Sequence, residues 1–245
     1  MDGTLVHIAF DAMAWLAAGL SLFWLTKIAH VRFPAAPTSG LAYIAALVFG
    51  AGVGAVLFGS ANLWLSHLPG IARSIEGAIF GGIVAVELYK RVAGITLRTG
   101  ARFALPLAVG VAVGRIGCFF SGLDDFTHGT ETALPWGYDF GDGVMRHPVQ
   151  LYESASMAAF ALLYIWLVRR NDRFVIDNGF YLAVGCYGAQ RFVWEFLKPY
   201  GTLIGPFTLF HLLSAALVAY AVVMIMTAPT PKPAQENQQH DRAFA

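Results

Sequence analysis

Three observations predict an all-α, polytopic membrane protein with about seven transmembrane helices. Of the 245 residues, 57% are hydrophobic and only 13% are charged, whereas soluble domains carry about 25% charged residues. The apolar residues are grouped into blocks long enough to cross a bilayer. The two cysteines, Cys118 and Cys186, both fall in such blocks, and they form neither a disulfide framework nor a metal-ligand spacing.

Seven apolar blocks are predicted to be membrane helices. With soft boundaries they run over Ala9–Ala29, Thr38–Leu57, Ser74–Tyr89, Phe103–Phe120, Gln150–Val168, Asn178–Phe196 and Pro206–Met226. The third is near the lower length limit for a span. Together they predict one transmembrane domain over residues 1–227. The tail from 228 to 245 is polar and proline-rich, so it is predicted to be disordered.

The first block is predicted to remain as a helix. It lacks a basic start, Asp2 and Asp11 are acidic, and no small-residue cleavage site follows. The second and third blocks are rich in glycine. These glycines are Gly50, Gly52, Gly54, Gly59, Gly77, Gly81 and Gly82. Small residues let helices approach closely in a bilayer, so close packing is expected here.

The basic residues predict the orientation. Eleven of them follow the first, third and fifth blocks or lie in the tail, whereas only Arg73, Arg146 and Lys198 lie on the other side. The positive-inside rule therefore predicts a cytoplasmic C-terminus and an external N-terminus. The net charge of only +1 argues against a nucleic-acid partner.

With this orientation, the polar residues of six blocks fall at a common depth near the outer face. Arg115 lies about 7–8 Å below the outer end of its block, at 1.5 Å per residue, and Arg191 and Glu195 lie in the outer third of theirs. Others at this level are Asp11, Glu76, Gln150, Tyr152, Glu153 and His211. A charge in hydrocarbon normally faces a bundle interior and has a partner.

Arg115 and Arg191 are predicted to hold a phosphate, because planar guanidinium groups suit bidentate phosphate contacts. In the outer leaflet the abundant phosphate belongs to lipid head groups. Two alternatives remain. Arg115 could extend to the membrane interface, or Arg191 could only pair with Glu195 one helical turn away.

Three segments, "GRIGCFFSG", "LPWGYDFGDGVMRHPVQLYES" and "QRFVWEF", occur in that order. Together they resemble the prolipoprotein diacylglyceryl transferase family, from the first helix to "GPFTLFHLLS". The resemblance implies a seven-helix enzyme of the bacterial cytoplasmic membrane without a cofactor. Its partners would be phosphatidylglycerol and prolipoprotein signal peptides, and it would transfer diacylglycerol to the thiol of a lipobox cysteine.

The resemblance also implies site residues. The "GRIG" motif contributes Gly114, Arg115 and Gly117, and the later motif contributes Arg191 with Glu195 as its acidic partner. The "HPxQLYE" element corresponds to His147, Pro148, Gln150, Leu151, Tyr152 and Glu153. These residues are expected to form the phosphate-holding half of the site.

Four positions depart from the family pattern. Cys118 replaces an asparagine, Gly122-Leu123 stands where the family has a Gly-Glu pair, and Asp11 aligns with a tyrosine of the first helix. Phe80 stands where the family has a histidine before the two glycines Gly81 and Gly82. The proton-handling half of the site is therefore not matched.

Several residues are candidates to activate the substrate thiol, whose free pKa is about 8.5. His147 is the first choice, because histidine titrates near neutral pH; its alternative role is a hydrogen bond to a loop. Asp11 and Glu76 are second choices, with helix capping or an interfacial position as the alternative. His211 is expected to be a packing residue. Cys118 is expected to be a small apolar filler rather than a nucleophile.

The long segment 121–149 is expected to be a solvated acidic loop without a metal site. Two further functional hypotheses follow from Phe80. The protein could be a non-catalytic paralogue that binds phospholipid or lipoprotein, or a transferase with a different acceptor. The arginine pair and the "RHPVQLYES" string favour the catalytic interpretation.

Overall fold

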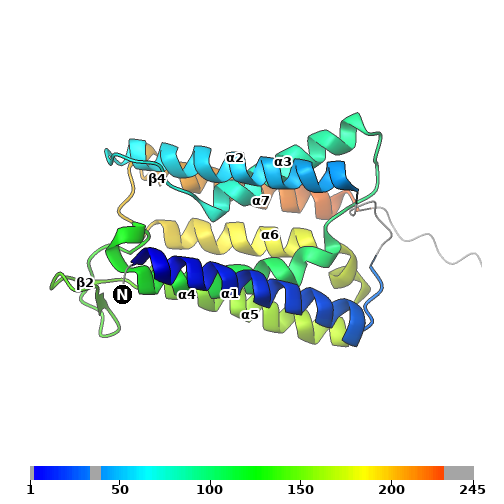
Figure 1. Cartoon of the computed structure of the whole chain (residues 1–245), viewed down its shortest axis with the longest axis horizontal. Coiled ribbons are helices and arrows are strands. Elements are labelled where there is room, and N and C mark those ends of the chain that lie inside the picture. Colours follow the sequence, from blue (N-terminus) through cyan, green and yellow to red (C-terminus); the bar gives the residue numbers. More distant parts are fainter. Residues whose placement is uncertain (1–2, 34–39, 229–245) are drawn as a thin grey trace, which may run out of the picture.

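The computed structural model describes residues 3–33 and 40–228, and they form a bundle of long helices (Figure 1). The helices are α1 (Gly3–Phe23, continued by the π-helical turn Trp24–Ile28), α2 (Leu41–Leu65), α3 (Ile75–Val92), α4 (Ala104–Ser121), α5 (Val149–Arg169), α6 (Arg173–Glu195) and α7 (Leu209–Met226). Five of them, α1, α2, α4, α5 and α7, are long and apolar enough to cross a membrane. The prediction of an all-α, multi-pass membrane protein is confirmed at this level.

Each of the seven predicted blocks coincides with one long helix. The main difference is in α2, which begins at Leu41 and continues to Leu65, eight residues beyond the predicted end. The two remaining helices, α3 and α6, carry charged residues at both ends. The predicted disordered tail lies outside the described residues from position 229 onward.

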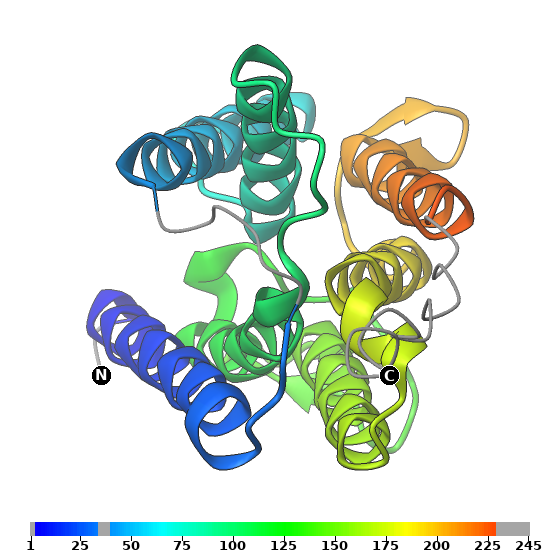
Figure 2. The same cartoon turned by 90° about the vertical axis from the view of Figure 1, so that its right-hand side faces the viewer.

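The helices are arranged around α6, which lies near the middle of the bundle (Figures 1 and 2). Helices α1, α4 and α5 lie on one side of it, and the α2–α3 pair lies on the other. The main packing pairs are α2 with α3, α1 with α4, α7 with α6, and α5 with α4. Consequently α4 and α6 contribute much of the buried core, including Leu105, Ala108, Ala183, Val184 and Tyr187.

Two short β-hairpins lie at one end of the bundle, the end at which α1 begins (Figure 1). Strands β1 (Tyr138–Asp139) and β2 (Met145–Arg146) form one, and β3 (Thr202–Ile204) and β4 (Phe207–Thr208) form the other. The C-terminal ends of α1, α3 and α5 lie at the opposite end. Successive helices therefore alternate in direction. The C-terminal ends of α4 and α6 and the N-terminal ends of α3, α5 and α7 all lie at the hairpin end of the bundle.

Part of the acidic loop forms the turn of the first hairpin. The Asp139 carboxylate accepts hydrogen bonds from the backbone N–H groups of Gly141, Asp142 and Gly143 at 2.8–3.1 Å. Among the described residues, no group of three or more His, Cys, Asp or Glu side chains has the arrangement of a metal site.

Glycines let α2 and α3 pack backbone to backbone. A β-carbon added at Gly54 would overlap the carbonyl oxygen of Gly77 and lie 2.9 Å from the Cα atom of Gly81. One added at Gly50 would lie 2.5 Å from the carbonyl oxygen of Gly81. The close approach expected from the sequence is confirmed at these positions, whereas Gly52 faces open space.

We predict that Gly54→Ala destabilises the protein by about 1–3 kcal/mol, because the new methyl group meets backbone that cannot move aside. Gly52→Ala is the matched control: it lies on the same helix, has no heavy atom within 4 Å of the added carbon, and should be neutral or slightly stabilising. The free energies of unfolding in mixed micelles measure both. Equal effects of the two substitutions would contradict tight packing at Gly54.

Candidate active site: a buried charge cluster

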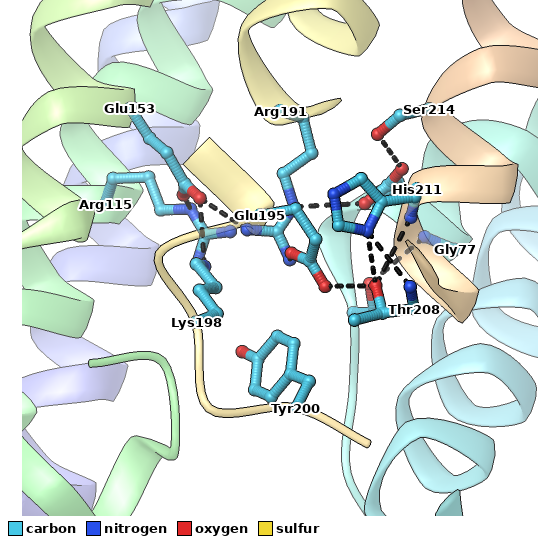
Figure 3. A network of polar contacts seen from close by, with 12 residues as sticks. Gly77, Arg115, Glu153, Arg191, Glu195, Lys198, Tyr200, Thr208, His211 and Ser214 are labelled. Atoms are coloured by element: carbon cyan, nitrogen blue, oxygen red, sulfur yellow. Dashed lines mark hydrogen bonds and ion pairs between the residues drawn. The ribbon is translucent and has the colours of Figure 1, made fainter. Parts of the chain in front are cut away.

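Six charged side chains meet inside the bundle (Figure 3). They are Glu76 of α3, Arg115 of α4, Glu153 of α5, Arg191 and Glu195 of α6, and Lys198 in the turn after α6. The exposed fraction of each residue is 7% or less. Three positive and three negative groups are thus removed from solvent together.

Arg191 is the centre of this cluster. Its Nε atom lies 3.0 Å from Glu76, its Nη2 atom lies 2.9 Å from Glu195, and its Nη1 atom pairs with Glu153. One guanidinium group therefore joins carboxylates from three helices. The alternative in which Arg191 pairs only with Glu195 is wrong, because Arg191 also pairs with Glu76 and Glu153.

Glu153 is the carboxylate that joins the three positive groups of the cluster. Its two oxygens pair with Arg115 and Arg191, and one of them lies 2.9 Å from Nζ of Lys198. Burying charged groups costs several kcal/mol per ion unless they are paired and hydrogen-bonded. The network supplies partners for all six, which explains why the chain tolerates them at this depth.

Two hydroxyl groups donate hydrogen bonds to carboxylates of the cluster. Ser214 donates a hydrogen bond to Glu76 at 2.6 Å, and Thr208 donates one to Glu195 at 2.7 Å. Thr208 is also the N-cap of α7, where it forms a capping box with His211. The backbone N–H of Thr208 donates to Nδ1 of His211 at 3.0 Å, so the ring hydrogen of neutral His211 is on Nε2.

The two arginines differ in their exposure and in the number of carboxylates with which they pair. The Arg115 side chain is 8% exposed and its ion-pair partner is Glu153, whereas the Arg191 side chain is 2% exposed and has three carboxylate partners. Nη1 of Arg115 also lies 3.7 Å from Sγ of Cys118. Arg115 is therefore the arginine that can accept a further anion, and Arg191 holds the cluster together.

Several buried polar groups near the cluster have no hydrogen-bond partner within the described residues. Both amide atoms of Gln150, the hydroxyl of Tyr187 and Nε2 of His211 are in this state. Gln150 precedes Glu153 by three residues on α5, and Tyr187 precedes Arg191 by four on α6, so each faces the same side as its charged neighbour. Buried polar groups are normally paired, and these are candidate contacts for a polar substrate.

The remaining predicted residues lie around the cluster rather than within it. His147 lies 3.4 Å from the hydroxyl of Tyr152, which also accepts a hydrogen bond from the indole of Trp136 at 2.9 Å. Asp11 is exposed on α1. Phe80 contacts Phe58 edge to face, with ring centroids 5.5 Å apart, and packs against both apolar core clusters.

The predicted glycines have packing roles. A β-carbon at Gly117 would overlap the side chain of Phe10 on α1, and one at Gly114 would reach the methyl group of Ala14. Gly81 and Gly82 face α2. These residues therefore hold α1 against α4 and α2 against α3, and so position the helices that carry the charges.

Lys198 is the cluster member that the sequence interpretation missed, because it was counted among the charges of an outer loop. A signal was present: Arg191, Glu195 and Lys198 are spaced by four and three residues, which places them on one helical face. Glu76 was considered only as a base or capping residue, and the structure gives it Arg191 and Ser214 as partners.

Comparisons of the sequence with known proteins identify its family. The family model described as prolipoprotein diacylglyceryl transferase matches residues 8–227. Similar proteins named phosphatidylglycerol–prolipoprotein diacylglyceryl transferase occur in Geobacter sulfurreducens, with 31% identity over 73% of this chain and 72% of that protein, and in Cupriavidus pinatubonensis, with 28% identity over 93% and 91%. No solved structure matches the chain. Because the family model spans nearly the whole helical bundle, the chain belongs to the prolipoprotein diacylglyceryl transferase family.

Proposed function

We propose that this protein transfers a diacylglyceryl group from phosphatidylglycerol to the thiol of a lipobox cysteine in prolipoproteins. The observation that carries the proposal is the buried charge cluster, because the two arginines and Glu153 come from the motifs that the family resemblance singles out. The names of the related proteins supply the donor lipid and the acceptor class.

Arg115 is the proposed contact for the lipid phosphate. Its guanidinium group is permanently charged, is the more exposed of the two, and has one carboxylate partner. The unpartnered amide of Gln150 and hydroxyl of Tyr187 supply further hydrogen bonds to the head group. Arg191 acts by holding Glu76, Glu153 and Glu195 in place.

The reaction needs no covalent enzyme intermediate. The substrate thiolate attacks the glyceryl carbon, a C–S bond forms, and the C–O bond to phosphate breaks. The electron pair leaves with glycerol phosphate. Negative charge accumulates on the leaving phosphate, so a fixed cation beside it stabilises the transition state more than the ground state.

The proposed location is the bacterial cytoplasmic membrane, with the charge cluster near the outer face. The N-terminus is then outside and the C-terminus is cytoplasmic, because the basic residues after α1, α3 and α5 belong inside. Both hairpins then face outward, where the prolipoprotein and the head group of phosphatidylglycerol are accessible.

We predict that reporter fusions active only in the periplasm give signal at Thr130 and none at Arg98 or Arg170. Thr130 lies between α4 and α5, and the two arginines lie after α3 and α5. Alkaline phosphatase fusions measure this, with cytoplasmic reporter fusions at the same three positions as the reciprocal control. A cytoplasmic signal at Thr130 would reverse the orientation and place the cluster in the inner leaflet.

Complementation tests the function directly. The chain should restore growth and lipoprotein maturation in bacteria depleted of their own diacylglyceryl transferase, and Arg115→Ala should not. In vitro, the purified protein should join a lipobox peptide to phosphatidylglycerol through a thioether. Binding of both substrates without product at any pH would instead identify a non-catalytic paralogue. Product with only another acceptor would identify a transferase of different specificity.

A further inference from the structure

We propose that Lys198 is a catalytic residue whose Nζ atom accepts the proton of the substrate thiol. This inference rests on the proposed diacylglyceryl transfer and names the group in this chain that handles its proton. Lys198 lies in the charge cluster, where its amine faces Glu153 (Figure 3).

Lys198 is a buried lysine with one ionic partner within the described part of the chain. Its side chain is 0% exposed, and Nζ lies 2.9 Å from Glu153. An ammonium group has three donor hydrogens, and Nζ also lies over the ring of Tyr200, 5.6 Å from its centroid. Glu153 is itself shared with Arg115 and Arg191, so it neutralises Lys198 only in part.

The groups that face Lys198 have opposing effects on its charged form: the two arginines disfavour it and the two glutamates favour it. They are Arg115 from α4, Glu153 from α5, Arg191 and Glu195 from α6, and Tyr200 from the following turn. Burial and the Arg191 guanidinium together lower the pKa of Lys198 to about 8, against the opposing effect of Glu153. About a tenth of the amine is then neutral at pH 7, and its pKa is close to that of a free thiol.

The other titratable groups near the cluster are less suited to accept this proton. Arginines do not lose their protons in proteins. The three carboxylates are all paired with Arg191. Nδ1 of His211 already accepts a hydrogen bond from Thr208, and Nε2 carries the ring hydrogen. His147 contacts Tyr152 outside the cluster. Phe80, beside the aromatic residues of the site, has no titratable group.

The proposed step is a proton transfer followed by a nucleophilic substitution. Neutral Nζ takes the S–H proton, and the electron pair of that bond stays on sulfur. The thiolate then forms the C–S bond as the C–O bond breaks, and the electron pair of the C–O bond leaves with the phosphate. The ammonium of Lys198 remains beside Glu153 and returns its proton to the departing phosphate or to water.

Lys198→Arg tests the proposal, because arginine keeps the positive charge and can pair with Glu153 but cannot accept a proton. The full-length protein is assayed from pH 6 to 9.5 with phosphatidylglycerol and two lipobox peptides, one with cysteine and one with selenocysteine. A selenol is already ionised at neutral pH and gains little from a general base. Lys90→Arg is the matched control, because Lys90 is a buried lysine paired with Glu87 at 3.1 Å on α3.

With the cysteine peptide at pH 7, Lys198→Arg should lose about 10²–10⁴ in kcat with little change in KM for phosphatidylglycerol. The loss should shrink as alkali ionises the thiol. With the selenocysteine peptide, the variant should approach wild type. Wild-type kcat should rise with pH to a plateau, with its midpoint at the pKa of the bound lysine, and Lys90→Arg should follow the wild-type profile.

Three results would overturn the assignment. Wild-type-like activity of Lys198→Arg with cysteine would mean that only charge is needed. Equal losses with both peptides would assign Lys198 to binding or folding. A wild-type kcat that does not vary from pH 6 to 9.5 would exclude any such titrating group, even if the variant fails to fold. Absence of product from wild type with either peptide would instead refute the proposed function itself.

Discussion

Arg115→Ala is expected to lower kcat for thioether formation by at least about 10²–10³, the typical effect of removing one donor that stabilises a developing oxyanion. The variant should still fold, because Glu153 keeps Arg191 and Lys198 as partners. The measurement is product formation by purified protein at saturating phosphatidylglycerol, together with its melting temperature in the same detergent.

Arg115→Lys separates phosphate recognition from simple charge. Lysine offers a point charge instead of a planar fork, so it should restore little activity. Arg91→Ala removes an exposed arginine from the last turn of α3 and serves as the control for general surface effects. Wild-type activity of Arg115→Lys would favour charge balance or extension of Arg115 to the interface.

Arg191→Ala is expected to abolish activity and also to destabilise the fold by about 3–5 kcal/mol, the cost of leaving buried charges without their partner. Glu76, Glu153 and Glu195 all contact this one guanidinium group. Glu195 would lose its ion pair with Arg191 and retain the hydrogen bond from Thr208. Unfolding free energy in mixed micelles and activity are measured on the same preparation.

Arg146→Ala is the matched stability control. It also removes an arginine paired with a carboxylate, but the Arg146–Asp142 pair lies in the exposed hairpin turn, and such pairs contribute little to stability. If Arg191→Ala unfolds at the wild-type free energy, Arg191 does not hold the cluster together. Loss of activity with unchanged stability would instead give Arg191 the same role as Arg115.

The helices and their order could be predicted from the sequence, because apolar blocks of spanning length have few other stable structures in a bilayer. All seven blocks are helices in the structure, and the glycine-rich pair packs closely at Gly50, Gly54, Gly77 and Gly81. Helix ends were less well predicted. The glycines Gly52, Gly54 and Gly59 do not end α2, which continues to Leu65 because its packing against α3 outweighs local helix propensity.

The candidate site could be predicted only in part. Motif and depth correctly selected Arg115, Glu153, Arg191 and Glu195 as residues that lie together. They did not select Lys198, since a charge just beyond a helix end is usually at the surface. They also gave both arginines one role, whereas the structure gives Arg191 three carboxylates and Arg115 one. The roles of the remaining site residues stay predictions.

By itself, the sequence determined that this chain forms long apolar helices, that six of them carry polar groups near one end, and that its motifs belong to one enzyme family. Those properties depend on composition, spacing and order along the chain. Only the tertiary structure decided which charge meets which. An ion pair requires its charged atoms to lie within about 4 Å of each other, and Glu76 and Arg191, 115 residues apart, come within 3.0 Å only because α3 and α6 pack in the same bundle. The division of labour between the two arginines, and the burial of Lys198, follow from that packing.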